Sequence, residues 1–179
     1  MKILVRWALP TIALLIVSSF CYANTKIQDF LSSQFDQTIP KPQRLWIDKD
    51  KQTEIKTNIN PNKVKLSYRY WHLNNKIVWI LDEIGKERDI TTGIVIENNT
   101  IQKVEVLAYR ESRGGQVQNP RFTQQYFQKN NKSNLTKEID SISGATLSVN
   151  ALNKQVQLAL LLNKYRINTE KVKETGIIQ

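Results

Sequence analysis

The sequence predicts an α+β fold in which helices pack on one side of an antiparallel sheet of about four strands. Apolar residues alternate with a period of two from residue 64 onward, and two Asn-Asn pairs are placed to reverse the chain between these runs. An apolar stripe with helical spacing follows near the C-terminus. The chain has 179 residues, about the length of one ordinary domain.

Residues 1–23 have the features of a secretory signal peptide. Lys2 and Arg6 precede a mostly apolar run from Ala8 to Phe20, and small residues in Cys21-Tyr22-Ala23 suit cleavage after Ala23. The run is short for a transmembrane helix, and an uncleaved anchor or lipidation at Cys21 are the alternatives. We therefore expect export to the periplasm, with membrane association if the segment is retained.

The composition excludes several kinds of site. The 26 Lys and Arg against 16 Asp and Glu give a net charge of +10, but the basic residues are scattered, so we expect no nucleic-acid binding. One Cys and one His (His72, expected on a hairpin surface) cannot form a c-type haem site, an iron–sulfur cluster or a four-ligand zinc site. We expect no metal site, and any redox chemistry would need an organic cofactor.

Residues 24–60 are expected to form an N-terminal helical segment. Helical spacing of Ile27, Phe30, Leu31 and Phe35 predicts an amphipathic helix over residues 25–37, which Pro40 and Pro42 end. Residues 45–47 should pack on the core, and residues 49–59 could form a polar helix. The turn at residues 60–62 is the expected boundary to a second unit, residues 61–179.

The second unit should contain two β-hairpins followed by helices. Predicted strands cover residues 64–73, 77–81, 90–97 and 101–109, with turns at 74–75 and 98–99 and a loop at 85–89. The run at 77–81 is apolar throughout, which is typical of a central strand. A short helix should span residues 120–128, with Phe122, Tyr126 and Phe127 apolar, before a polar loop. The C-terminal helix, about residues 146–165, has a buried stripe of Val149, Leu152, Val156, Ala159 and Leu160, broadened by Leu158, Leu161 and Leu162.

The segment Asp140-Ser141-Ile142-Ser143-Gly144-Ala145-Thr146-Leu147-Ser148 is the most informative for function. It is a loop of small residues that leads into a helix N-terminus, where free backbone N–H groups and the helix dipole favour an anion. Gly144 and Ala145 leave room for another molecule, and Thr146 presents a hydroxyl in the first turn. The same pattern is also that of an ordinary hydroxyl-rich helix cap.

The motif Asp140-x-x-Ser143-Gly144-Ala145-Thr146 resembles the flavinylation motif of the FMN-binding domain family. That family includes flavin-bearing subunits of the sodium-pumping NADH:quinone oxidoreductase and of Rnf complexes, and smaller exported electron carriers. The resemblance extends over residues 68–162, including the stretches at 79–87 and 109–115. It implies that a flavin transferase, dependent on FAD and Mg²⁺, attaches FMN covalently to Thr146 as a phosphoester.

The resemblance also suggests which neighbours serve the cofactor. Gly114 and Gly115 would let the backbone approach the flavin, while Arg110 or Arg113 would oppose its negative charge; alternatively, Glu111 and these arginines form a solvated turn. Asp140 either orients the motif loop by accepting backbone N–H groups, or positions the acceptor hydroxyl during attachment, or forms an Asx-turn. The expected cofactor-binding residues are Thr146, Ser143, Gly144, Ala145, Asp140, Leu147, Glu111, Arg113, Gly114 and Arg110. Candidates for an aromatic wall are Tyr109, Phe122, Tyr126 and Trp71.

These observations lead to an exported flavoprotein that transfers electrons between membrane or periplasmic redox partners, rather than a stand-alone enzyme. One alternative is a non-redox binding module on the same scaffold. Another is a secreted hydrolase, which has little support because the mature chain would have no Cys nucleophile, no G-x-S-x-G sequence and only one His.

Overall fold

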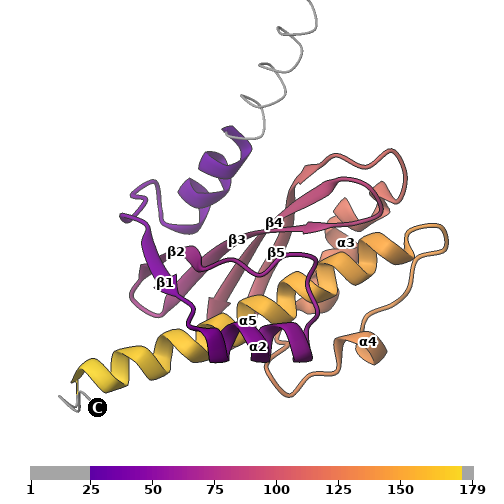
Figure 1. The fold of residues 1–179 in the computed structure, drawn as a ribbon. Coiled ribbons are helices and arrows are strands. Elements are labelled where there is room, and N and C mark those ends of the chain that lie inside the picture. The colour runs from indigo at the N-terminus through magenta and orange to yellow at the C-terminus, as the bar shows by residue number, and fades with distance from the viewer. Residues whose placement is uncertain (1–24, 175–179) are drawn as a thin grey trace, which may run out of the picture.

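The computed structural model describes residues 25–174, and the predicted signal peptide lies outside this range. The fold is α+β, as predicted, with one antiparallel five-stranded sheet in the order β1-β2-β3-β4-β5 (Figure 1). The strands are β1 (Gln43–Trp46), β2 (Ser67–Leu73), β3 (Lys76–Ile84), β4 (Asp89–Glu97) and β5 (Thr100–Tyr109). The helices are α2 (Lys49–Asn58), α3 (Pro120–Thr123), α4 (Leu135–Glu138) and α5 (Thr146–Glu174), with 3-10 turns η1 (Gly115–Gln118) and η2 (Gln124–Tyr126).

The sheet confirms the two predicted hairpins. Asn74, Asn98 and Asn99 adopt positive φ angles of 55°, 50° and 63°, which asparagine tolerates better than most residues, and so the chain reverses tightly after β2 and β4. The predicted central strand lies within β3, the middle strand of the five.

β1 is a strand that the sequence analysis did not predict. It pairs with β2 at the edge of the sheet, with Leu45 opposite Tyr68. Leu45 and Ile47 are buried as expected, but Trp46 is 68% exposed, so the expectation that it packs on the core is wrong. Alternation along β1 turns Trp46 away from the face that Leu45 buries.

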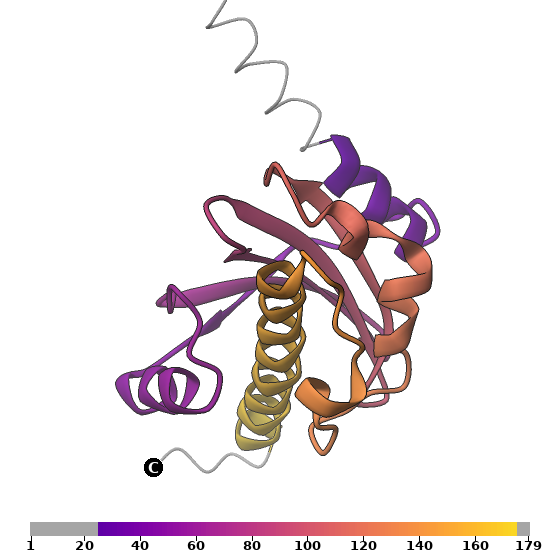
Figure 2. The same cartoon turned by 90° about the vertical axis from the view of Figure 1, so that its right-hand side faces the viewer.

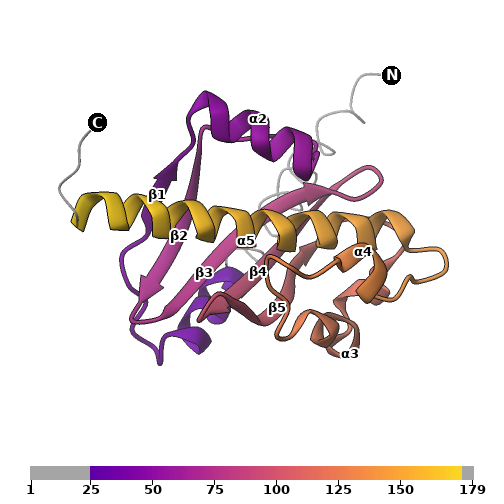
Figure 3. The same cartoon turned by 90° about the horizontal axis from the view of Figure 1, so that it is seen from below.

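α5 covers one face of the sheet, which we call the inner face (Figures 2 and 3). All five residues of the predicted stripe are buried, as are Leu158 and Leu162. They pack with Trp79 and Leu81 of β3 and with Ile90 and Ile94 of β4. The amide of Gln155, also buried, donates to the Ile90 carbonyl oxygen at 2.6 Å, which fixes α5 against β4. The helix continues to Glu174, beyond the predicted end at residue 165.

The opposite, outer face of the sheet carries a helix as well, so the expectation of helices on one side only is wrong. Residues 25–34 are helical and lie across this face (Figures 1 and 2). Phe30, Leu31 and Phe35 form a second buried cluster with Trp71, Val78, Val95 and Leu107. Gly93 of β4 makes room for the Phe30 ring, since a β-carbon at residue 93 would lie within 3.0 Å of three of the ring's atoms.

Shorter elements complete the inner layer. α2 agrees with the predicted polar helix and begins after Asp48, whose carboxylate accepts the Lys51 backbone N–H at 2.9 Å. α3 and η2 replace the single helix predicted over residues 120–128, with Phe122 and Tyr126 buried but Phe127 51% exposed. Among residues 25–174, no helix is both long and apolar enough to cross a membrane.

Candidate functional site

Thr146 is the first residue of α5, and its side chain is exposed. The preceding turn is closed by the Ala145 N–H, which donates to the Ile142 carbonyl oxygen at 2.9 Å, and the helix starts with the Val149 N–H bonded to the Ala145 carbonyl oxygen at 3.0 Å. The backbone N–H groups of residues 146–148 have no acceptor within residues 25–174. An accessible hydroxyl therefore lies beside three free donors at the positive end of a long helix, where an attached anion is stabilised.

The loop around Gly144 is open. Gly144 has a φ of +77°, and a β-carbon at this position would have nothing within 4 Å. Ser143 and Gly144 are both exposed, whereas Ala145 is buried and ties the loop to the core. The motif therefore presents the Thr146 hydroxyl at the surface, while the adjacent Ala145 is packed in the core.

A second loop, which follows β5, packs against the motif. Gly114 has a φ of +84°, and a β-carbon there would lie 2.8 Å from the Ser148 Oγ and 3.3 Å from the Ala145 Cβ. The Tyr109 and Ser148 hydroxyls are 2.9 Å apart and share a hydrogen bond, and the Tyr109 hydroxyl also donates to the Arg113 carbonyl oxygen. The sequence analysis did not predict this contact between the end of β5 and the first turn of α5.

Glu111 binds backbone N–H groups of another turn, and not the neighbouring arginines that were expected as its partners. Its Oε1 accepts the backbone N–H groups of Lys86, Glu87 (2.7 Å) and Arg88 (3.0 Å) in the turn between β3 and β4. These hydrogen bonds, that from Arg88 above all, hold the pKa of the Glu111 carboxyl below its ordinary value. Glu111 therefore joins the β3–β4 turn to the β5–η1 loop, and its carboxylate pairs with no arginine of the described residues 25–174.

The remaining charged candidates are dispersed. Arg110 points to the outer face, where its Nη1 donates to the Thr91 Oγ1 at 2.9 Å and to the Asp89 carbonyl oxygen at 3.2 Å. Arg113 is exposed next to Gly114. Asp140 is exposed, and within residues 25–174 its carboxylate accepts no hydrogen bond, so it neither forms the Asx-turn nor holds the motif loop through backbone N–H groups. Its own backbone N–H donates to the Gln125 Oε1 at 2.9 Å.

The four aromatic candidates for a flavin wall lie in different parts of the molecule. Tyr109 reaches the motif through its hydrogen bond with Ser148, and Trp71 lies in the outer cluster. Phe122 and Tyr126 are buried in the inner core, to which Ala145 also belongs. The Tyr126 hydroxyl donates to the Asn153 Oδ1 at 2.7 Å, and burial raises the pKa of this tyrosine.

A groove of about 410 Å³ begins immediately after Thr146 and follows α5; we call it the α5 groove. Its apolar surface includes Leu147 and Ile84, which are 50% and 41% exposed, and Lys154 adds a cation that is paired with the buried Glu83 carboxylate at 3.8 Å. Sequence reasoning did not identify Ile84 as part of the site. A signal was present for Leu147, because it is an apolar residue outside the buried stripe of its own helix.

Residues 85–161 match the model of the FMN-binding domain family, a range that runs from the β3–β4 turn through most of α5. It includes Glu111, Gly114, Thr146 and the packed contact between their loops. A comparison with curated proteins finds no significant match to the chain.

Proposed function

Because residues 85–161 match the FMN-binding domain family, we propose that the chain is an exported electron carrier with FMN esterified to Thr146. The observation that supports this most directly is the exposed Thr146 hydroxyl at the start of α5, in an open loop of small residues. In the proposed attachment, the Thr146 Oγ–phosphorus bond forms as the diphosphate of FAD breaks. AMP leaves, the hydroxyl proton passes to solvent, and a separate transferase with Mg²⁺ supplies the catalysis.

The residues around Thr146 suit the two parts of FMN. Free N–H groups at residues 146–148 would hold the phosphate, and the open space at Gly144 leaves its approach clear. Leu147 and Ile84 offer an apolar surface for a flat ring system. When bound, FMN accepts and donates electrons.

Covalent attachment agrees with the proposed export. A carrier outside the cytoplasm could not readily regain a cofactor that dissociated, whereas an ester bond keeps FMN in place. The α5 groove is open to solvent along its exposed apolar residues, so a ring held there would be accessible to redox partners at the membrane or in the periplasm. The donor and acceptor would therefore meet the flavin at the surface near Leu147 and Ile84.

The test is the intact mass of the protein produced together with a flavin transferase, followed by peptide mapping. We expect an added mass equal to FMN less one water on the peptide that contains Thr146. Thr146→Ala should abolish the addition, and Thr146→Ser should retain it because the hydroxyl remains. Loss of a helix-start hydroxyl changes the free energy of unfolding by only about 1 kcal/mol, so the alanine variant should stay folded.

Ser143→Ala is the matched control, since it removes another exposed hydroxyl of the motif and should leave the ester on Thr146. FMN that remains covalently bound in Thr146→Ala would contradict the assignment. An unmodified wild-type chain, with a transferase that modifies a control substrate, would favour the non-redox binding module.

A further inference from the structure

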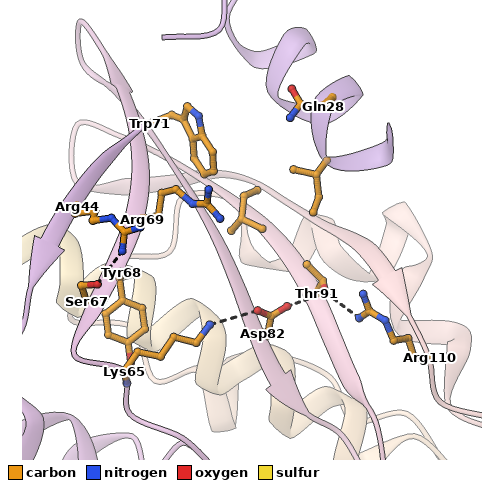
Figure 4. Close-up of a pocket in the computed structure, with 12 residues that line it drawn as sticks. Gln28, Arg44, Lys65, Ser67, Tyr68, Arg69, Trp71, Asp82, Thr91 and Arg110 are labelled. Carbon is orange, nitrogen blue, oxygen red and sulfur yellow. Dashed lines mark hydrogen bonds and ion pairs between the residues drawn. The ribbon is translucent and has the colours of Figure 1, made fainter. Parts of the chain in front are cut away.

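A second hollow, of about 470 Å³, lies on the outer face of the sheet beside the helical segment 25–34 (Figure 4). We call it the outer groove. Four of its lining side chains are cationic and one is a carboxylate: Arg44, Lys65, Arg69, Arg110 and Asp82. It lies on the face of the sheet that α5 does not cover.

The positive charge of the outer groove is only partly neutralised. Asp82 is shared between Lys65, at 3.4 Å, and the Thr91 hydroxyl, which donates to it at 2.8 Å. Within the part of the chain that the structure describes, neither Arg44 nor Arg69 forms an ion pair. Arg44 has a long hydrogen bond to the Ser67 Oγ at 3.4 Å, and the Arg69 guanidinium lies 5.6 Å from the Trp71 ring centre.

The strand register places these two arginines side by side. Arg44 of β1 is directly opposite Arg69 of β2, on the same face of an antiparallel pair. Like charges in directly opposed positions destabilise a sheet. An anion bound between them would remove this repulsion, and the planar guanidinium fork matches the oxygen geometry of a phosphate.

The same groove also has an apolar wall, formed by Ile27, Trp71 and Ile80. A ligand that used both parts would have a phosphate next to an apolar substituent. Ile27 and Gln28, on one side of the groove, follow soon after Ala23 in sequence, and the other lining residues come from the strands and loops between residues 44 and 110.

We propose that the outer groove binds a phosphate ester, with the phosphate between Arg44 and Arg69 and an apolar part against Trp71 and Ile80. The apolar wall next to the two arginines favours a membrane phospholipid as the source, because its phosphate is attached to apolar chains. A soluble phosphate ester would offer the same chemistry. Because the groove and Thr146 belong to different faces of the sheet, binding does not require FMN.

The experiment is calorimetric titration of the protein, purified as cells process it, with dihexanoyl phosphatidylglycerol kept monomeric and, separately, with glycerol phosphate. The double variant Arg44→Gln/Arg69→Gln removes both guanidinium groups. Lys132→Gln/Lys137→Gln is the matched control, because it removes two exposed positive charges far from the groove lining. Arg69→Lys keeps the charge but loses the fork, and serves as a milder second variant.

We expect the wild type to bind the short-chain lipid and the double variant to bind it at least about tenfold more weakly, with the lysine control within about twofold of the wild type. Arg69→Lys should fall between them. Equal binding by the wild type and folded Arg44→Gln/Arg69→Gln, or no binding of either ligand by the wild type, would overturn the proposal. Glycerol phosphate binding as tight as that of the lipid would overturn the lipid assignment, because the apolar contact with Trp71 and Ile80 would then add nothing to binding. The intact mass of each sample should show that FMN attachment is unaffected.

Discussion

Two glycines beside Thr146 have left-handed backbone conformations, but their surroundings differ. Gly114 is buried against Ser148, Tyr109 and Ala145, whereas Gly144 faces open space. The left-handed conformation alone disfavours alanine by about 1–2 kcal/mol at either position. At Gly114, a methyl group must also displace two hydroxyls that are bonded to each other at 2.9 Å.

We therefore expect Gly114→Ala to lower the free energy of unfolding by about 2–4 kcal/mol, as strain and overpacking add, and Gly144→Ala by about 1–2 kcal/mol. Urea unfolding of the two variants and the wild type measures both values, and Gly144→Ala is the control for the backbone effect alone. Equal losses would mean that the β5–η1 loop moves freely away from α5 and does not support the motif.

At the level of single residues, the motif was easier to predict than the contacts that hold it in place. Thr146, Gly144 and Ala145 are adjacent in the chain, so their arrangement follows from a loop that enters a helix. The contact of Tyr109 with Ser148 joins residues far apart in sequence and depends on where the first turn of α5 meets the end of β5. Arg110 illustrates the same limit, because strand alternation turns it to the face opposite Tyr109, a result that needs the exact end of β5.

At the level of the elements, Glu111 links the β3–β4 turn to the β5–η1 loop, and the stability that this link contributes should depend on pH. The carboxyl has a depressed pKa in the folded protein, so it contributes stability above its ordinary value of 4.5, and this contribution is lost as the pH falls through the folded pKa. We expect Glu111→Gln to be less stable than the wild type near pH 7, with a shallower loss of stability below 4.5.

Urea unfolding at a series of pH values tests this expectation. Glu87→Gln is the control, since Glu87 lies in the same turn and is exposed, but its carboxylate accepts none of the three backbone hydrogen bonds. It should keep the wild-type slope below 4.5. Parallel curves for Glu111→Gln and the wild type would show that the hydrogen bonds to the carboxylate do not stabilise the loop.

The elements that sequence reasoning found and missed differ in length and position. β3 and β4 have nine residues each; β3 begins directly after one Asn-Asn turn and β4 ends at the other, so periodicity and turn chemistry agree. β1 and α4 have only four residues each. β1 follows two prolines and contains the polar, exposed Gln43 and Arg44, as an edge strand does, and such a short run gives too little alternation to recognise.

For the whole molecule, the two-sided covering of the sheet could have been inferred from one strand. The run from Ile77 to Leu81 is apolar at every position, and successive side chains of a strand point to opposite faces, so both faces needed a cover. α5 covers Ile77, Trp79 and Leu81, and the segment 25–34 covers Val78, with Ile80 at its margin. The sequence therefore contained both the strand that needed a second cover and the amphipathic N-terminal helix that supplies it.

The packing of the helical segment 25–34 on the outer face should depend on how the Phe30 ring fits over Gly93. Removing the buried Phe30 side chain should lower the free energy of unfolding by about 3–5 kcal/mol, and Gly93→Ala by about 1–3 kcal/mol, because the new methyl group would overlap the ring. If that overlap is the cause, Gly93→Ala should be nearly neutral in a Phe30→Ala background, with a coupling of at least about 1 kcal/mol between the two changes. A double-mutant cycle by urea unfolding measures it. Additive losses would mean that alanine at residue 93 disturbs β4 itself. Because Thr146 belongs to the inner layer, FMN attachment should persist in every folded variant of the cycle.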